Sequence, residues 1–260
     1  MTTTLTRWGH SCVRLDREGS VLVVDPGSFS DVGAALAGVG TILITHEHGD
    51  HVDAPAVVVA VARGARVVAP APVAAALVAA GAPAERVRVV VPGDRLVAEG
   101  FDILVLGGEH APIHADVPRA VNVAYLVDEA VLHPGDSYAR PPTGVAVEVL
   151  LAPLGGPWVL VADVVDYVRA VAPARVAVIH DAHLAAAGAR LAAGLVSRLG
   201  GAGEVVLLGR GESISIEAVS DRGDLPVLEY DETVAPRPEE EIADVARSRP
   251  DPAGHGGDLV

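Results

Sequence analysis

Short runs of branched apolar residues recur along the chain, separated by Gly, Pro and polar positions. Runs of this kind, bounded by turn residues, are typical of buried β-strands. In the first half of the chain they predict strands over 21–24, 41–44, 66–69, 87–91 and 101–106. In the second half they predict strands over 121–127, 130–132, 147–151, 175–179, 204–208 and 213–216.

Longer segments between these runs have the composition of helices. They cover 54–63 and 72–80 in the first half, with Pro55 and Pro72 near the first turns, and 160–171 and 183–199 in the second half. No short repeat is visible, which argues against a solenoid. Because predicted strands alternate with predicted helices in both halves of the chain, we predict an α/β or α+β protein with two sheets and helices outside them.

The composition changes at about Asp231. The remainder is rich in Glu, Asp, Pro and Arg and has few apolar residues. We therefore expect a folded domain over 1–230 and a disordered or loosely docked tail over 231–260, with at most one helical turn around 239–247.

Half of the chain is hydrophobic but only 3% is aromatic, so the core is expected to consist of small and branched aliphatic side chains. Cys12 is the single cysteine; it excludes an intrachain disulfide, disfavours thiolate metal sites and is interpreted as a small core residue. No apolar run reaches the roughly 18–20 residues of a membrane span, and the N-terminus does not have the pattern of a signal peptide. A cytoplasmic location and no membrane partner are expected.

The formal net charge is −15, and all 19 basic residues are Arg. An acidic surface repels phosphate backbones, so no nucleic-acid partner is expected. The lack of Lys excludes Schiff-base catalysis by a lysine. The sequence contains no indication of the oligomeric state.

The densest candidate chemistry is the run His46-Glu47-His48-Gly49-Asp50-His51, directly after the predicted strand 41–44. In extended backbone, His46 and His48 point to the same side. Gly49 is expected to permit a sharp turn that brings Asp50 and His51 to a neighbouring point. Two imidazoles for one ion, and a carboxylate with an imidazole for a second, suit borderline divalent metals such as Zn²⁺.

Further candidate ligands follow other predicted strands. His110 comes after a Gly-Gly turn, Asp136 ends the turn His133-Pro134-Gly135-Asp136, and His180 follows the strand 175–179. Loops at strand ends converge on one edge of a sheet, so we expect a shared site.

The order His-x-His-x-Asp-His, a distant His, an Asp in a Gly-Asp turn and a final His resembles the metallo-β-lactamase fold superfamily over about residues 5–216. The segments Trp8-Gly9-His10-Ser11 and Val24-Asp25-Pro26 are most similar to its L-ascorbate-6-phosphate lactonase-like metal-dependent hydrolases. This resemblance implies an α+β fold, a four-layer αββα sandwich.

The resemblance also implies roles for individual residues. The first metal would be bound by His46, His48 and His110, the second by Asp50, His51 and His180, and Asp136 would bridge both. Asp25 matches a carboxylate that supports the metal loop, and His10 lies where these hydrolases carry a histidine beside the site, although a structural role is equally open. His114 is the alternative to His110 as a ligand; the preceding Gly-Gly turn favours His110.

Several residues near these motifs are interpreted individually. Tyr138 is a candidate substrate contact, and His183 could contact the substrate or cap the helix that it enters. Arg119 and Arg140 are candidates for holding a substrate carboxylate or phosphate. Glu47 is expected to point away from the metals. Structural or surface roles are expected for His133 and His255.

The resemblance implies two divalent cations, with Zn²⁺ preferred and Mn²⁺ or Fe²⁺ compatible, and a bridging hydroxide that cleaves a small ester, lactone or phosphoester. Asp50 would be the acid/base group. Ser11 and Cys12 do not have the flanking pattern of a nucleophile elbow, which argues against a serine hydrolase. Two alternatives stay open: a phosphodiesterase acting on nucleotides or nucleic-acid ends, and a non-catalytic metal-binding member of the fold.

Overall fold

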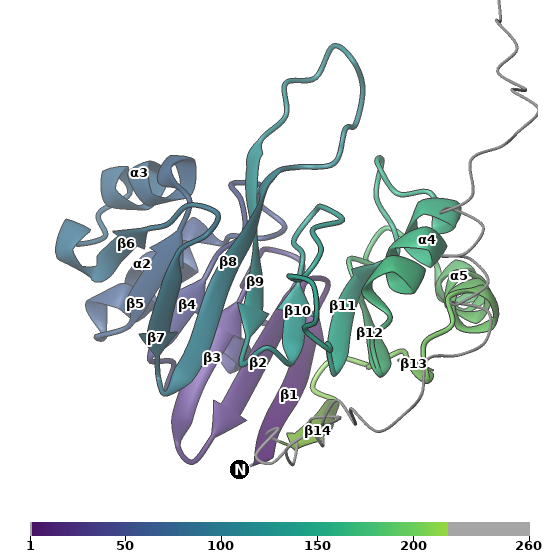
Figure 1. Cartoon of the computed structure of the whole chain (residues 1–260). Helices are drawn as coiled ribbons and strands as arrows, with labels where there is room; N and C mark the ends of the chain where they lie inside the picture. The colour runs from purple at the N-terminus through teal and green to yellow at the C-terminus, as the bar shows by residue number, and fades with distance from the viewer. Residues whose placement is uncertain (1, 218–260) are drawn as a thin grey trace, which may run out of the picture. The chain divides into compact units, whose positions relative to one another are not determined.

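Two seven-stranded mixed sheets pack face to face in the computed structural model, which describes residues 2–217 (Figure 1). The predicted tail over 231–260, its helical turn and His255 lie outside the described residues. The first sheet has the order β14-β1-β2-β3-β4-β5-β6. Its strands are β1 (Thr2–Gly9), β2 (Cys12–Arg17), β3 (Ser20–Val24), β4 (Thr41–Leu43), β5 (Arg66–Ala69), β6 (Val87–Val89) and β14 (Ser213–Glu217).

The second sheet has the corresponding order β13-β12-β11-β10-β9-β8-β7. Its strands are β7 (Arg95–Ala98), β8 (Phe101–Glu109), β9 (Val121–Val127), β10 (Val131–His133), β11 (Val149–Pro153), β12 (Arg175–Ile179) and β13 (Glu204–Val206). In each sheet one half is antiparallel and the other half, β3 to β6 or β10 to β13, is parallel.

Helices cover the outer face of each sheet. The helices are α1 (Val32–Ala35), α2 (Ala54–Ala62), α3 (Ala71–Ala79), α4 (Val161–Val171) and α5 (Ala186–Leu199), with a 3₁₀ turn, η1 (Ala84–Arg86). One apolar cluster joins α2 and α3 to the outer face of β4 and β5, and another joins α4 and α5 to β11 and β12. A third lies between the sheets, where Leu22, Phe101 and Tyr125 are fully buried. These four layers confirm the predicted α+β sandwich.

The apolar pattern missed β1, β2 and β7. In β2 the sequence Cys12-Val13-Arg14-Leu15-Asp16-Arg17 alternates apolar and charged side chains, because Val13 and Leu15 face the core while Arg14 and Asp16 pair with each other. A search for continuous apolar runs does not detect such a strand; period-two alternation would. The predicted strand 87–91 ends earlier, at Val89, and the predicted strand 101–106 extends to Glu109.

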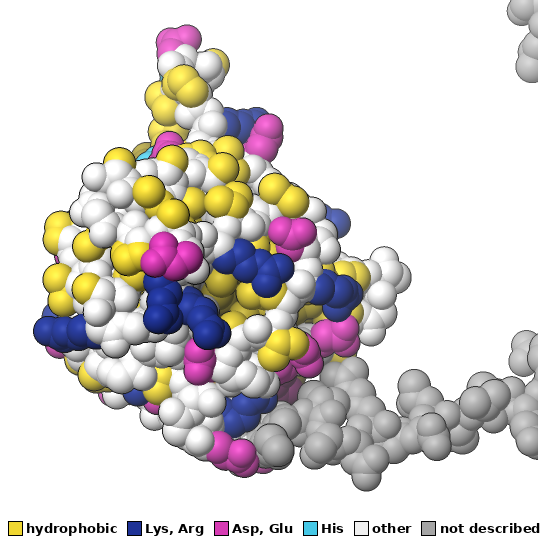
Figure 2. All heavy atoms as spheres, turned by 90° about the vertical axis from the view of Figure 1, so that its left-hand side faces the viewer, with side chains coloured by type: hydrophobic (Ala, Val, Ile, Leu, Met, Phe, Trp, Pro, Cys, Tyr) yellow, Lys and Arg dark blue, Asp and Glu magenta, His cyan; other side chains and the backbone are white. Residues whose placement is uncertain are grey.

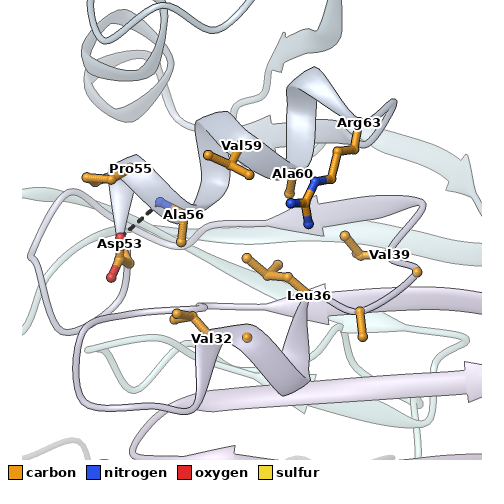
Figure 3. A pocket seen from close by; sticks show the side chains of 12 residues that line it. Val32, Leu36, Val39, Asp53, Pro55, Ala56, Val59, Ala60 and Arg63 are labelled. Carbon is orange, nitrogen blue, oxygen red and sulfur yellow. Dashed lines mark hydrogen bonds between the residues drawn. The ribbon is translucent and has the colours of Figure 1, made fainter.

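A groove of about 700 Å³ lies between α1 and α2 (Figure 3). Its walls are mainly apolar, including Leu36 and Val59, and Arg63 lies at one end. The carboxylate of Asp53 at the other end accepts the Ala56 N–H and thereby caps α2. The groove therefore has apolar packing surface and one capping carboxylate, without a catalytic constellation.

Hydrogen bonds tie the two sheets together beneath the loop that follows β4. The single hydroxyl proton of Tyr125, in the second sheet, is shared between the carbonyls of Ile44 (2.9 Å) and Val68 (3.1 Å) in the first. The Val123 N–H donates to the Thr45 carbonyl at 2.9 Å. These bonds hold the start of the histidine-rich loop against the opposite sheet. Within residues 2–217, the helices are too short or too polar to cross a bilayer.

Candidate metal centre

Side chains from several strand ends gather at one end of the sandwich in two groups. Within each group, one ligand atom per residue lies within 4.8 Å of all the others. The first cluster consists of His46, His48, His110 and Asp136, and the second of His10, Asp50, His51 and His180. The structure thus brings all seven predicted ligands together and adds His10, although their binding of metal stays a prediction.

Asp136 connects the two clusters. Its Oδ2 lies 3.2 Å from Nε2 of His110 and 3.1 Å from Nε2 of His180, while its Oδ1 lies 3.0 Å from Nε2 of His51. Nevertheless Oδ1 and the Nε2 atoms of His51 and His180 are buried without a hydrogen bond of acceptable geometry among the described residues. Buried polar atoms that converge without pairing are the donor set a divalent cation needs, so these residues fit one.

The other ring nitrogen of these histidines is held by the protein. Nδ1 of His110 lies 2.6 Å from the Ala111 carbonyl oxygen, and Nδ1 of His180 contacts the Gly155 carbonyl. A carbonyl only accepts, so each Nδ1 carries the proton and each Nε2 presents a lone pair to the centre. Metal-binding histidines are typically oriented in this way.

Asp25 lies behind the histidine-rich loop of residues 45–51 (the metal loop) and supports it. Its fully buried carboxylate accepts the N–H of Thr45 (2.8 Å), the hydroxyl of Thr45 (2.7 Å) and Nδ1–H of His51 (2.7 Å). This is the location that the resemblance implied for Asp25. Two residues later the backbone passes so close to the loop that a Cβ on Gly27 would lie 1.8 Å from the Asp50 carbonyl oxygen.

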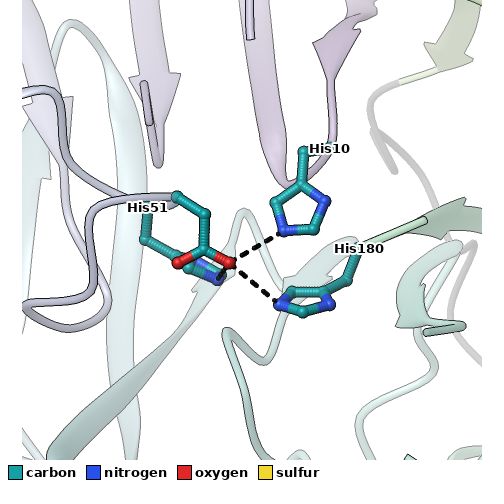
Figure 4. A group of neighbouring side chains, drawn as sticks. His10, His51 and His180 are labelled. Atoms are coloured by element: carbon teal, nitrogen blue, oxygen red, sulfur yellow. Dashed lines mark hydrogen bonds and ion pairs between the residues drawn. The ribbon is translucent and has the colours of Figure 1, made fainter. Parts of the chain in front are cut away.

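In the second cluster three imidazoles face one carboxylate (Figure 4). Oδ2 of Asp50 lies 3.1 Å from Nε2 of His10, 3.6 Å from Nε2 of His180 and 3.9 Å from Nε2 of His51. Nδ1 of His10 accepts the Ala182 N–H at 3.3 Å, so the proton is on Nε2 and is donated to Asp50. His10 has a left-handed backbone (φ 47°), a conformation that is costly for a non-glycine residue and is concentrated at functional sites.

Burial and mutual charge shift the pKa values of these groups. Burial alone would raise the pKa of Asp50, but the hydrogen bond from His10 and the His51 charge hold it below its usual range. Burial would lower the pKa of His51, yet the carboxylates of Asp136 and Asp25 outweigh it and raise that pKa well above 6.5. For His46 burial dominates, and its pKa is well below 6.5. Burial would likewise raise the pKa of Asp136, but the His51 charge and the neighbouring imidazoles hold it well below its usual range. The carboxylates of Asp50 and Asp136 are therefore both ionised at neutral pH, as cation ligands must be.

Other predicted residues lie outside the two clusters. His114 is exposed, and its Nδ1 accepts the Asp116 N–H, so the structure places His110 and not His114 in the cluster. Glu47 is exposed, as expected. Arg119 is exposed and pairs with Glu109 at 2.8 Å, and Arg140 is also exposed.

The candidate substrate contacts differ in their access to the centre. The Tyr138 ring packs against Trp158 and Tyr167, at 5.6 and 5.3 Å between ring centroids, and lies outside both clusters. His183 is exposed and stacks 5.5 Å from His180 at the edge of the second cluster.

The expected turn at Gly49 is present and brings Asp50 and His51 into one cluster, but it does not require a glycine. The φ of Gly49 is not positive, and a Cβ there would meet nothing within 4 Å. The turn is closed by the His51 N–H donating to the His48 carbonyl at 2.9 Å, with backbone angles that any residue adopts. The glycine that the loop requires is Gly27, on the neighbouring segment.

Sequence reasoning missed two residues that hold Asp136. The amide of Asn122 accepts the Asp136 N–H and donates to the Pro134 carbonyl, both at 2.9 Å. The indole N–H of Trp158 donates to Oδ2 of Asp136 at 3.2 Å. Trp158 follows β11 after Gly155-Gly156, which is the strand-end signal that identified the other candidates.

Comparisons with known proteins identify the family of the chain. The sequence pattern described as the β-lactamase superfamily domain matches residues 4–180. Protein Rv0786c of Mycobacterium tuberculosis is 38% identical over 188 residues, which cover 70% of this chain and 85% of that protein.

Solved structures share the fold at lower sequence identity. Igni18, a metallo hydrolase from Ignicoccus hospitalis, superposes with a TM-score of 0.65 at 20% identity and covers 84% of this chain and 99% of its own. CmlA, a diiron β-hydroxylase from Streptomyces venezuelae, has a TM-score of 0.61 at 18% identity and covers 82% of this chain and 54% of its own. At these identities the likeness shows the fold alone.

Proposed function

The chain belongs to the metallo-β-lactamase fold superfamily of metal-dependent hydrolases, and we propose that it cleaves a small ester, lactone or phosphoester with two bound divalent cations. The observation that carries this proposal is the position of Asp136, whose two oxygens contact histidines of both clusters. One carboxylate shared by two histidine-rich clusters suits a dinuclear centre.

The donor set also limits which metal suits the centre. Imidazole and carboxylate without thiolate fit Zn²⁺, and also Mn²⁺ or Fe²⁺; Cys12 is fully buried in the core, where burial raises the pKa of its thiol to about 12. We propose Zn²⁺ as the resident metal. When bound, such ions would lower the pKa of a bound water and polarise a carbonyl or phosphoryl oxygen.

We assign the proton-transfer role to Asp50. Its side chain is 21% exposed, in contrast to 3% for Asp136, so it is the more accessible carboxylate of the centre. The hydrogen bond from Nε2–H of His10 occupies one lone pair of Oδ2 and orients the carboxylate. The other oxygen is then free to accept a proton from the attacking water and to pass it to the leaving group.

The exposed aromatic ring of Phe29 lies beside the second cluster, where it could contact an uncharged part of a small substrate. Phe29 is 46% exposed, although the chain contains only two Phe residues, and the other, Phe101, is fully buried. The Phe29 ring lies 5.4 Å from His10 and 6.0 Å from His183. We propose that these rings contact an apolar part of the substrate. The lactonase-like subtype is part of the same proposal and rests on the two N-terminal segments around His10 and Asp25.

Polynucleotide substrates are not favoured by the charge distribution. On the face that includes α2, α3 and β6, Arg side chains lie among acidic and hydrophobic ones (Figure 2). Together with the net charge of −15, this favours a small-molecule substrate over a nucleic acid.

The proposal is tested by metal analysis and a substrate panel. The full chain, purified without added metal, is expected to contain about two equivalents of divalent metal, and activity should be lost with a chelator and restored by Zn²⁺. p-Nitrophenyl acetate, simple lactones and bis-p-nitrophenyl phosphate separate the esterase, lactonase and phosphodiesterase alternatives.

Matched variants connect the activity to the clusters. His46→Ala is expected to lower the metal content, and Asp50→Ala to remove most turnover. His114→Ala, an exposed histidine outside both clusters, should leave both unchanged. A chain that binds two metals but hydrolyses none of the panel, nor a thioester, would indicate a non-catalytic metal-binding protein. Full metal content and activity in His46→Ala would contradict the assignment.

A further inference from the structure

Trp158 donates its indole N–H to Asp136, the carboxylate between the two clusters. We infer that it is a positioning residue that fixes the orientation of Asp136 and thereby sets the metal affinity of the centre. This inference rests on the proposed function, because it takes Asp136 as a metal ligand.

The direction of the hydrogen bond is unambiguous. The indole nitrogen is a donor only, and a carboxylate oxygen is an acceptor, so the 3.2 Å contact between Nε1 of Trp158 and Oδ2 of Asp136 is an N–H donation to the carboxylate. The Trp158 side chain is buried, and the residue is only 7% exposed. Water therefore competes little for this donor.

The indole ring of Trp158 packs among three other aromatic rings. Its neighbours are the rings of His110, His180 and Tyr138, at centroid distances of 5.6, 5.7 and 5.6 Å, all close to edge-to-face. Such aromatic contacts orient a ring as well as burying it. Trp158 thus touches one histidine of each cluster in addition to the carboxylate between them.

Gly156 makes this approach geometrically feasible. Its φ of 144° is a conformation that L side chains rarely adopt, and a Cβ there would lie 3.2 Å from Nε1 of Trp158 and 3.1 Å from Cε1 of His180. Only glycine leaves room for the indole nitrogen and the imidazole to lie side by side at this point. The turn after β11 is therefore shaped to present the indole N–H.

The donated hydrogen bond makes the two oxygens of Asp136 unequal. Oδ1 has no hydrogen bond among the described residues, whereas Oδ2 accepts from Trp158 and also lies 3.2 Å from Nε2 of His110. Each carboxylate oxygen has about two lone-pair directions. Oδ2 retains one for a cation and Oδ1 retains both, and the carboxylate cannot rotate without breaking the bond to the indole.

The chain offers a matched control in its other tryptophan. Nε1 of Trp8 is buried but has no hydrogen-bond partner among residues 2–217. Trp8→Phe therefore removes an indole N–H without removing a hydrogen bond, whereas Trp158→Phe keeps an aromatic ring and removes the donor to Asp136.

The test measures Zn²⁺ binding to the full-length protein by competition with a chromophoric chelator. Trp158→Phe is expected to weaken Zn²⁺ binding by about 10–100-fold, the usual effect of losing a group that orients a metal ligand. Trp8→Phe should bind as the wild type does. Equal affinity in Trp158→Phe and wild type overturns the inference while leaving the proposed function intact; a wild type that binds no divalent metal overturns the proposed function itself.

If Trp158→Phe does not fold, a second measurement tests whether Trp158 donates to Asp136. In Trp8→Phe protein labelled with ¹⁵N-tryptophan, Trp158 gives the sole indole N–H resonance. This resonance is expected to be protected from solvent exchange without metal and to shift with stoichiometric Zn²⁺. Rapid exchange, or a resonance that does not respond while Zn²⁺ binds, excludes the hydrogen bond to a metal-binding carboxylate.

Discussion

Oδ2 of Asp25 lies 2.7 Å from Nδ1 of His51, and neither side chain is exposed to solvent. The carboxylate can only accept, so it holds the proton of the imidazole on Nδ1 and leaves Nε2 as the nitrogen that faces Asp136. The same carboxylate binds the backbone and the hydroxyl of Thr45, where the metal loop begins. One buried group therefore orients a candidate ligand and anchors its loop.

Asp25→Asn should weaken metal binding by about 10–100-fold, the usual effect of removing a group that orients a metal-binding histidine. An amide has one accepting end, so at least one of the donors from Thr45 or His51 would face an NH₂ group. Chelator competition measures the affinity. Asp116→Asn, which alters a carboxylate that is 91% exposed, is the control. Wild-type affinity in Asp25→Asn would show that the carboxylate does not orient His51 for metal binding.

Gly27→Ala should disrupt the metal loop. A Cβ at this position would lie 1.8 Å from the Asp50 carbonyl oxygen and 2.5 Å from the His51 nitrogen, both backbone atoms that cannot rotate away. Overpacking of this kind lowers the free energy of unfolding by about 1–3 kcal/mol or more. It would also displace two candidate ligands, Asp50 and His51. Melting temperature and metal content report the two effects.

Gly49→Ala is the matched control for this change, because a Cβ there meets open space. It should keep the metal content and melt close to the wild type, although Gly49 lies inside the histidine-rich run. If both alanine variants behave alike, the close approach of the backbones at Gly27 is not what shapes the loop.

Three interior strands, two of them parallel and one antiparallel to its neighbours, were the most predictable part of the fold. The strands at 66–69, 121–127 and 175–179 have the predicted bounds, because central strands covered on both faces have continuous apolar sequences. β1 is mostly polar, with four Thr and one Arg among its eight residues, and β2 alternates polar and apolar residues. β7 is a short edge strand with Val97 exposed, so runs of apolar residues mark none of the three.

The candidate site was predictable where a ligand directly follows its own strand, as His46 and His180 do. It was not predictable where two chain segments meet from different sheets. The His180 N–H donates to the His10 carbonyl at 3.2 Å, which brings the end of β12 to the turn after β1. Nothing near His10 in the sequence encodes that contact. Trp158 and Asp136 follow neighbouring strands of one sheet, β11 and β10, but the hydrogen bond between them depends on side-chain directions that the sequence does not specify.

Tyr125→Phe should lower the free energy of unfolding by about 1–3 kcal/mol, because the buried Ile44 carbonyl loses the hydroxyl that donates to it. Each kcal/mol corresponds to roughly 2–4 °C in the melting temperature of a domain of this size. Tyr138→Phe is the control: its buried hydroxyl has no hydrogen-bond partner among the described residues, so its removal should be nearly neutral or slightly stabilising. Thermal melts that place the two variants at the same temperature would contradict the role of Tyr125 in joining the sheets.

Without metal, the protein should lose stability as the pH falls from about 7.5 to 5.5. Burial lowers the pKa of four histidines below 6.5 in the folded state: His10, His46, His48 and His133. The unfolded chain then binds more protons than the folded one, so their contribution to stability is present above pH 6.5 and decreases as the pH drops through that value. His51, whose pKa is raised, acts in the opposite sense: its contribution is complete below pH 6.5 and is lost as the pH rises through its folded pKa. Because four histidines lose stabilisation on acidification and only His51 gains it, acidification should lower the melting temperature measured in excess chelator.

Two histidine variants serve as test and control. His10→Gln should flatten the dependence of the melting temperature on pH, and His114→Ala, at an exposed position, should not. A melting temperature that stays constant or rises toward pH 5.5 would mean that these histidines are already protonated in the folded state.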